Sequence, residues 1–208
     1  RTFGREQCVT RNEILGAAAE IISAKGYDAT SMQDIADAVN LQKASLYYHF
    51  SSKQEILFAL LDRALGLLTD RLEGVRSAKL PPEEKLRQAM ITYLNTIAGE
   101  QHLASVLLLE YRSLEPALRQ QHILRRDQVE KLWRDLIIEG VEAGVFQCAE
   151  PSLAGRAILS VLNWTVTWYR KNGAKTSEQI ADQFATLFLK GLIERDDDSG
   201  SGMGTNIN

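Results

Sequence analysis

Apolar residues recur at intervals of three and four along almost the whole chain, and this helical spacing limits what the chain can fold into. Only four prolines occur in 208 residues, so long runs of good helix formers are uninterrupted. No stretch alternates apolar and polar residues over a useful strand length, and no internal repeat is evident. The sequence therefore predicts an all-α protein.

Capping signals mark the first expected helices. A T-x-x-E box at residues 10–13 opens a helix over 11–25, and either Thr30 or Ser31 can cap a short second helix. A third short helix is expected over 43–50, after a turn of three residues. Two short helices joined by such a turn indicate a helix-turn-helix.

Ser52 is expected to cap a long fourth helix, and from residue 79 the chain predicts five more helices with apolar faces. These are expected at Pro82–Ala98, Leu103–Ser113, Pro116–Gly140, Leu153–Arg170 and Ser177–Glu194. We expect three parts: a helix-turn-helix domain over 8–53, a larger helical domain over 54–195, and a disordered acidic and Gly/Ser-rich tail over 196–208.

Composition, charge and the absence of known motifs limit the classes of function that the sequence can support. The formal net charge of −3 does not indicate a nucleic-acid binder, so any case for DNA depends on where the charges lie. Cys8 and Cys148 lie far apart without metal-ligand spacing and are expected to be reduced thiols. Apolar runs are too short to cross a bilayer, which predicts a soluble, cytoplasmic protein with no membrane partner. No nucleophile elbow, phosphate loop or metal motif is evident, so no enzyme activity, catalytic residue, metal or cofactor is expected.

The third helix contains the sequence LYYHF, residues 46–50, and a helical wheel divides its side chains into two faces. Leu46 and Phe50 are expected to face the core. The outward face carries Ala44, Ser45 and Tyr48, with Tyr47 and His49 at its edges. This face suits the major groove of B-DNA, and Lys43 and Lys53 could meet phosphates on either side.

A structural interpretation of the same residues is also open. Tyr47, Tyr48 and His49 could form a partly buried aromatic patch in a small helical domain. A metal role for His49 is disfavoured because no second ligand follows three or four residues away.

The run EIISAKGYDATSMQDIADAVNLQKASLYYHFSSKQEIL, residues 20–57, closely resembles the DNA-binding domain of the TetR family of bacterial one-component repressors. The specific features are the entry G-Y-x-x-T-S, the pair Ile35-Ala36, and the ending LYYHF-x-x-K. The resemblance implies DNA contacts from Ser31, Gln33, Gln42, Lys43, Ala44, Ser45, Tyr47, Tyr48, His49 and Lys53.

Two positions depart from the family pattern. Asn40 stands where members usually have Gly, but Asn tolerates the left-handed conformation, so the turn is expected to survive. Gln42 stands where Ser is common; Gln is a poor N-cap, so its side chain either points at DNA or has another role.

Members of the family use their carboxy-terminal helices to dimerise and to bind a small effector, and the resemblance implies both here. An apolar stripe on the last helix is the expected homodimer interface, together with a preceding helix that is apolar almost all round. The stripe comprises Ile180, Phe184, Leu187, Phe188 and Gly191. A twofold dimer would read a palindromic operator in double-stranded DNA.

An effector pocket is expected between the middle helices and the penultimate helix. Its candidate residues are Tyr93, Leu107, Tyr111, Trp133, Trp164 and Trp168, although aromatic stripes at helical spacing are more often core. The segment LNWTVTWYRKNGAKTSEQIADQFATLFLKGL, residues 162–192, is similar to a subgroup that responds to long-chain acyl-CoA in lipid catabolism. Candidate phosphate ligands are Arg112, Arg119, Arg125, Arg126 and Arg170, each of which could instead be a solvated helix arginine.

The sequence thus predicts a dimeric repressor that a small hydrophobic effector, first of all a long-chain acyl-CoA, releases from DNA. Two alternatives stay open: a regulator of the same type that responds to a drug or aromatic compound, and a helical interaction module without DNA binding.

Overall fold

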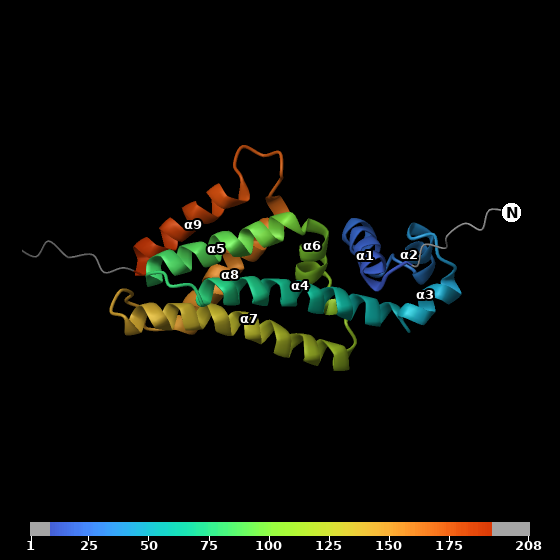
Figure 1. The fold of residues 1–208 in the computed structure, drawn as a ribbon, viewed down its shortest axis with the longest axis horizontal. Helices are drawn as coiled ribbons and strands as arrows, with labels where there is room; N and C mark the ends of the chain where they lie inside the picture. The colour runs from blue at the N-terminus through green and yellow to red at the C-terminus, as the bar shows by residue number, and fades with distance from the viewer. Residues whose placement is uncertain (1–8, 193–208) are drawn as a thin grey trace, which may run out of the picture.

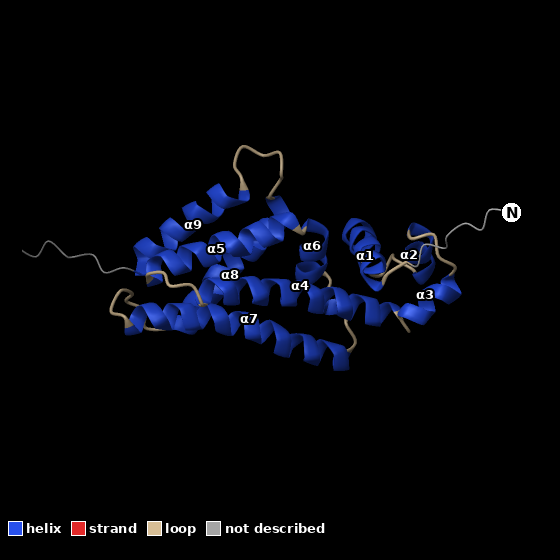
Figure 2. Ribbon diagram, viewed as in Figure 1, coloured by secondary structure: helices blue, strands red, loops and turns tan. Residues whose placement is uncertain are grey.

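The computed structural model describes residues 9–192, and within that range every regular element is a helix (Figures 1 and 2). The elements are α1 Arg11–Lys25, α2 Met32–Ala38, α3 Lys43–His49, α4 Lys53–Arg76, α5 Pro82–Gly99, α6 Gln101–Leu109, the 3₁₀ helix η1 Tyr111–Ser113, α7 Pro116–Glu142, α8 Pro151–Trp168 and α9 Ser177–Leu192. None of these helices is long and apolar enough to span a membrane. The all-α prediction is confirmed.

Helices α1, α2 and α3 lie together at one end of the molecule, and α4 runs from them into the larger helical group (Figure 1). There α4 packs against α5, α6 and α7, while α8 packs on α7 and α9 packs on α5. Helix α6 also packs against α1, so it joins the two groups of helices. One hydrophobic core runs through both groups.

The capping signals form the bonds that the sequence predicts. The Thr10 hydroxyl accepts from the backbone N–H of Glu13, and Ser52 caps α4 in the same way through Glu55. Ser31 is the residue that caps α2, whereas the Thr30 hydroxyl donates to the carbonyl of Gly26 at 2.8 Å. These local bonds fix where each helix begins.

The predicted helix 103–113 is divided into α6 and η1, because the chain tightens to i→i+3 hydrogen bonds after Leu109. Ser113 N–H donates to Glu110 O, and Leu114 N–H donates to Tyr111 O. The predicted ranges for α1, α3, α5, α7 and α8 agree with the structure to within two residues, and the predicted end of the last helix, Glu194, lies outside the described residues. The predicted tail, 196–208, and Cys8 lie outside the described residues, and Cys148 is a half-buried free cysteine.

The turn between α2 and α3 has the left-handed residue that the sequence suggests. Asn40 has φ of 53°, and its backbone N–H donates to Asp37 O at 3.1 Å. The N–H of Leu41 then reaches back to Ala36 O at 2.9 Å. Since only Gly and, to a lesser degree, Asn visit this conformation readily, Asn40 sets the angle between α2 and α3.

Replacing Asn40 by Val should lower the free energy of unfolding by about 1–2 kcal/mol, because a β-branched residue is strained at positive φ. Asn40→Gly is the matched control and should stay within about 0.5 kcal/mol of the unaltered protein. Urea unfolding followed by circular dichroism measures both. An equal loss in the two variants would show that the Asn40 side chain, and not its backbone conformation, matters.

Candidate DNA interface and effector cavity

Helix α3 is held by two buried residues and presents its other side to solvent. Leu46 and Phe50 are fully buried, as the helical wheel predicts. Tyr48 is 90% exposed and Tyr47 is 46% exposed, so Tyr48 does not belong to the partly buried aromatic patch of the alternative interpretation. Half-buried His49 touches Tyr48 edge-on, with ring centres 5.7 Å apart. The packing leaves the outward face of α3 free for a groove.

The residues predicted to contact DNA from the start of α3 are exposed, and Gln33 of α2 is exposed but already hydrogen-bonded within the protein. Lys43, Ala44 and Ser45 lie exposed along the first turn of α3. Gln42 is exposed at the N-cap position and makes no side-chain capping bond, which leaves its amide free. On α2, the amide of Gln33 donates to Asp37 at 2.7 Å.

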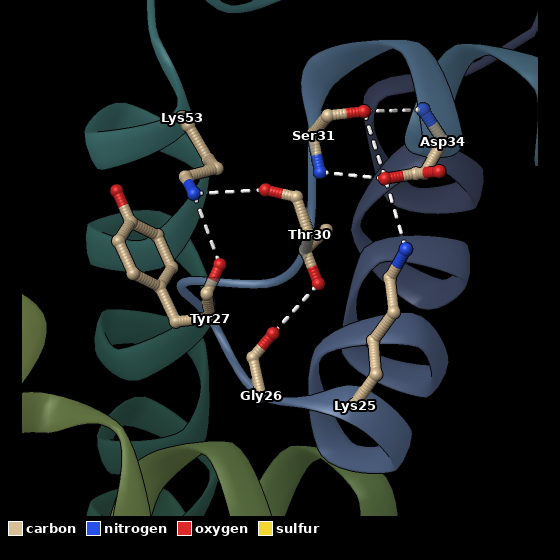
Figure 3. Close-up of polar contacts among 7 residues, drawn as sticks. All are labelled: Lys25, Gly26, Tyr27, Thr30, Ser31, Asp34 and Lys53. Atoms are coloured by element: carbon tan, nitrogen blue, oxygen red, sulfur yellow. Dashed lines mark hydrogen bonds and ion pairs between the residues drawn. The ribbon is translucent and has the colours of Figure 1, made fainter.

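Ser31 belongs to a compact polar cluster at the start of α2 (Figure 3). One carboxylate oxygen of Asp34 accepts from both the backbone N–H and the hydroxyl of Ser31, each at 2.7 Å, and lies 2.9 Å from Lys25 Nζ. The Lys25 ammonium and then the Ser31 N–H hold the pKa of Asp34 well below its usual range. The hydroxyl of Ser31 is therefore used first by the helix cap.

Lys53 is placed differently from the prediction. Its ammonium group points to the loop between α1 and α2, where it donates to Tyr27 O at 3.0 Å and Thr30 O at 2.8 Å (Figure 3). It also lies 4.1 Å from the centre of the Tyr27 ring. The sequence predicts that this cation contacts a DNA phosphate; within the protein, its ammonium group donates to two carbonyls of the loop. In this structure Lys53 connects α4 to the DNA-binding helices.

Arg11 has a role that sequence reasoning missed. Its guanidinium donates to the carbonyl of His49 at 2.8 Å and to Glu55 at 3.1 Å, and it lies 4.0 Å from the centre of the Phe50 ring. The backbone N–H of Ser51, and then Arg11, lower the pKa of Glu55. Arg11 thus binds the carboxyl end of α3, where a positive charge is favourable. No local motif indicates a contact across 38 residues.

The larger helical group encloses a cavity of about 800 Å³, which is in the usual range for small-molecule sites. Residues of α4, α5, α6, η1, α7 and α8 line it. Its apolar wall comprises Leu65, Leu107, Leu108, Leu109, Val129, Leu159 and Val166. Arg112, Arg126 and Arg156 also line it and are exposed. Glu130 lines it too and is paired with Arg156, so the lining keeps a net positive charge.

Four of the six predicted effector residues lie on the wall of this cavity: Tyr93, Leu107, Tyr111 and Trp164. Trp133 does not, because it is fully buried in the core, where it packs edge-on against Tyr93 with ring centres 5.6 Å apart. Trp168 is 45% exposed at the end of α8 and is absent from the lining. Both tryptophans follow the helical period, which does not distinguish core, cavity and surface.

Two of the five predicted arginines, Arg112 and Arg126, line the cavity. The other three have different surroundings. Arg119 donates to the carbonyls of Arg112 and Leu114, Arg125 donates to Asp62 at 2.8 Å, and Arg170 lines a separate pocket. Arg156 was missed by sequence reasoning; it is bound to Glu130 at the cavity opening.

The predicted dimer stripe is divided between two faces of α9. Ile180 is buried on the side of the helix that also carries Ala181, Ala185 and Leu189, so it is not available to a partner. Leu187 is 68% exposed, Gly191 is exposed, and Phe184 and Phe188 are half-buried. Helix α8 likewise exposes large apolar residues, Leu153 and Trp164 above all, rather than being buried on several sides within the chain.

The wall of the cavity and the DNA-binding helices are joined by direct contacts. Glu110, between Leu107 and Tyr111 of the wall, accepts from the backbone N–H of Tyr27 at 3.3 Å. Gln54 donates to the Tyr27 hydroxyl at 2.9 Å and to Ser113 O at 2.8 Å. The short segment that joins α6 to η1 therefore lines the cavity and also contacts Tyr27, in the loop before α2, and Gln54 of α4.

An exposed helix-turn-helix joined to a helical ligand-binding region is the architecture of a one-component DNA-binding regulator. Residues 14–60 match the family model "Bacterial regulatory proteins, tetR family", and residues 79–192 match "Tetracyclin repressor-like, C-terminal domain". The chain belongs to the TetR family and is a TetR-type DNA-binding transcriptional repressor. The family is regulatory rather than enzymatic.

Among curated proteins, the chain is similar to the HTH-type transcriptional repressor KstR2 of Mycobacterium tuberculosis, with 32% identity over 188 residues, which cover 88% of this chain and 93% of that protein. Among solved structures, the TetR family regulator PfmR of Thermus thermophilus is 39% identical with a TM-score of 0.81, covering 88% and 99% of the two chains. AibR, solved with isovaleryl coenzyme A and operator DNA, is 27% identical with a TM-score of 0.78, covering 85% and 96%.

Lys53→Met and Lys43→Met should separate a structural lysine from an exposed one. Losing the Lys53 ammonium removes the donor to Thr30 O, while Tyr27 O keeps the backbone N–H of Thr30, so the free energy of unfolding should fall by about 1–3 kcal/mol. Lys43→Met should leave stability within about 0.5 kcal/mol and reduce the slope of log affinity against log salt by about one. Urea unfolding and DNA titration at several salt concentrations measure the two effects. Unchanged stability in Lys53→Met would contradict this assignment.

Proposed function

We propose that the chain is a dimeric repressor that binds a palindromic operator and is released from it by a long-chain acyl-CoA. The observation that carries the proposal is the cavity of about 800 Å³, with its apolar wall and arginine-bearing opening, in a chain of this family. An acyl chain suits the apolar wall, and coenzyme A phosphates suit Arg112, Arg126 and Arg156. The similarity to AibR, solved with an acyl coenzyme A, supports this ligand class.

The arginines favour this ligand over the alternative effectors. A drug or aromatic compound could fill the apolar part of the cavity, but a neutral one would leave the positive opening unused. In the proposed mechanism, the effector changes the position of α6 and η1, and their contacts with Tyr27 and Gln54 carry the change to the DNA-binding helices. Such coupling between sites is typically about 1–3 kcal/mol.

Dimerisation in the proposal uses the exposed apolar faces of α8 and α9. Leu187 of α9 and Leu153 of α8 are each about two-thirds exposed, and exposed apolar side chains on these two helices support a protein interface. Two helices from each chain would form a four-helix interface with twofold symmetry. For such a dimer to dock on two half-sites, the two copies of α3 must lie about 34 Å apart, one turn of B-DNA, or a multiple of that distance.

Leu187→Asp should convert the dimer to a monomer, because a carboxylate is not tolerated in a desolvated apolar interface. Leu124→Asp is the matched control: Leu124 is a leucine on α7 that is 64% exposed, against 68% for Leu187. Sedimentation equilibrium of the full chain should give a dimer for the control and a monomer for Leu187→Asp. Two dimers would place the interface elsewhere.

Selection of bound duplexes from a random DNA library, with and without palmitoyl-CoA, tests the proposed function as a whole. The expected result is an enriched palindrome that disappears when palmitoyl-CoA is added. Tyr48→Ala should lose the enrichment while its thermal unfolding is unchanged, because Tyr48 makes little contact with the core. A palindrome that is indifferent to palmitoyl-CoA would remove the ligand from the proposal, and no enrichment at all would remove the operator.

A further inference from the structure

His122 is a buried polar residue on the wall of the cavity. It lies on α7, is 3% exposed, and stacks on Tyr111 with ring centres 6.0 Å apart and planes at 27°. Arg126 follows one helical turn later and also lines the cavity. His122 therefore forms part of the cavity wall, one turn of α7 before Arg126.

The Nδ1 atom of His122 is buried and has no hydrogen-bond partner among residues 9–192. Buried polar atoms are nearly always paired, and leaving one unpaired costs roughly 1–3 kcal/mol. Burial, and then the charge of Arg126, lower the pKa of His122, so the ring is neutral near pH 7. A neutral imidazole has one N–H donor and one acceptor to offer.

Two other polar groups of the wall, the hydroxyls of Tyr93 and Ser160, donate hydrogen bonds within the protein. The hydroxyl of Tyr93 donates to Asn163 at 2.7 Å, and the hydroxyl of Ser160 donates to the carbonyl of Arg156 at 2.8 Å. Trp133 Nε1 is buried without a partner among the described residues, but Trp133 does not line the cavity. His122 thus combines an unmet hydrogen-bonding capacity with a place on the cavity wall.

We infer that the His122 imidazole donates a hydrogen bond to a carbonyl oxygen of the effector and so selects an acyl compound over an alkyl compound of the same length. This inference rests on the proposed function, because it assigns one group of the proposed ligand to one residue. The apolar wall would hold the chain, His122 the carbonyl that follows it, and the arginines the anionic part. The ligand class is then an acyl thioester rather than any long amphiphile.

Two ligands that differ only at this carbonyl test the inference: palmitoyl-CoA and its thioether analogue S-hexadecyl-CoA. We expect the unaltered full chain to bind the thioester roughly 2- to 10-fold more tightly by calorimetry, the usual net worth of one hydrogen bond. His122→Phe keeps a ring that can stack on Tyr111 but has no N–H, so the two ligands should bind it equally. His122→Gln restores a donor and should recover part of the preference.

Ser160→Ala is the matched control, since it removes a polar group of the wall that is already satisfied, and its preference should equal that of the unaltered chain. Equal binding of both ligands by the unaltered chain would overturn the inference without any variant, while the acyl-CoA proposal would stand. A preference that persists in His122→Phe would also overturn it, because the carbonyl would then be recognised elsewhere. Binding of neither ligand would overturn the proposed effector and this inference together.

Discussion

Tyr27 is the joint on which the rest of the structure depends. Its carbonyl accepts from Lys53, its ring lies beneath the same ammonium group, its hydroxyl accepts from Gln54, and its N–H donates to Glu110. These contacts come from α4 and from the end of α6, so both helices meet the loop between α1 and α2 at this one residue. Burial raises the pKa of Tyr27, which keeps the hydroxyl neutral. The DNA-binding helices are fixed to the larger domain here.

These contacts of Tyr27 provide a route by which a ligand in the cavity could affect the DNA-binding helices in the proposed mechanism. Helix α6 and η1 form part of the cavity wall through Leu107 and Tyr111, and the carboxylate of Glu110, which lies between them, accepts from the backbone N–H of Tyr27. In the proposed mechanism, a displacement of Glu110 would move Tyr27 and, through the chain that follows it, α2 and α3. In a dimer, a small rotation of each α3 is enough to spoil simultaneous docking on two half-sites.

Local features could be predicted from the sequence, and long-range contacts could not. The caps of α1, α2 and α4, the buried side of α3 and the left-handed Asn40 all follow from residues a few positions apart. Lys53 and Arg11 bind backbone carbonyls 23 to 38 residues away, which no periodicity indicates. Trp133 and Trp164 share the same helical pattern, yet one is core and the other is two-thirds exposed. No local pattern singles out His122, because its surroundings come from tertiary packing.

The proposed mechanism couples the cavity to the exposed face of α3, and thermodynamic linkage makes such coupling reciprocal. The most direct test is the dissociation constant of palmitoyl-CoA for the full chain, measured alone and again with a saturating amount of the selected operator duplex. We expect the operator to weaken palmitoyl-CoA binding about 5- to 150-fold, by the same factor as palmitoyl-CoA weakens operator binding. Equal dissociation constants in the two titrations would contradict it.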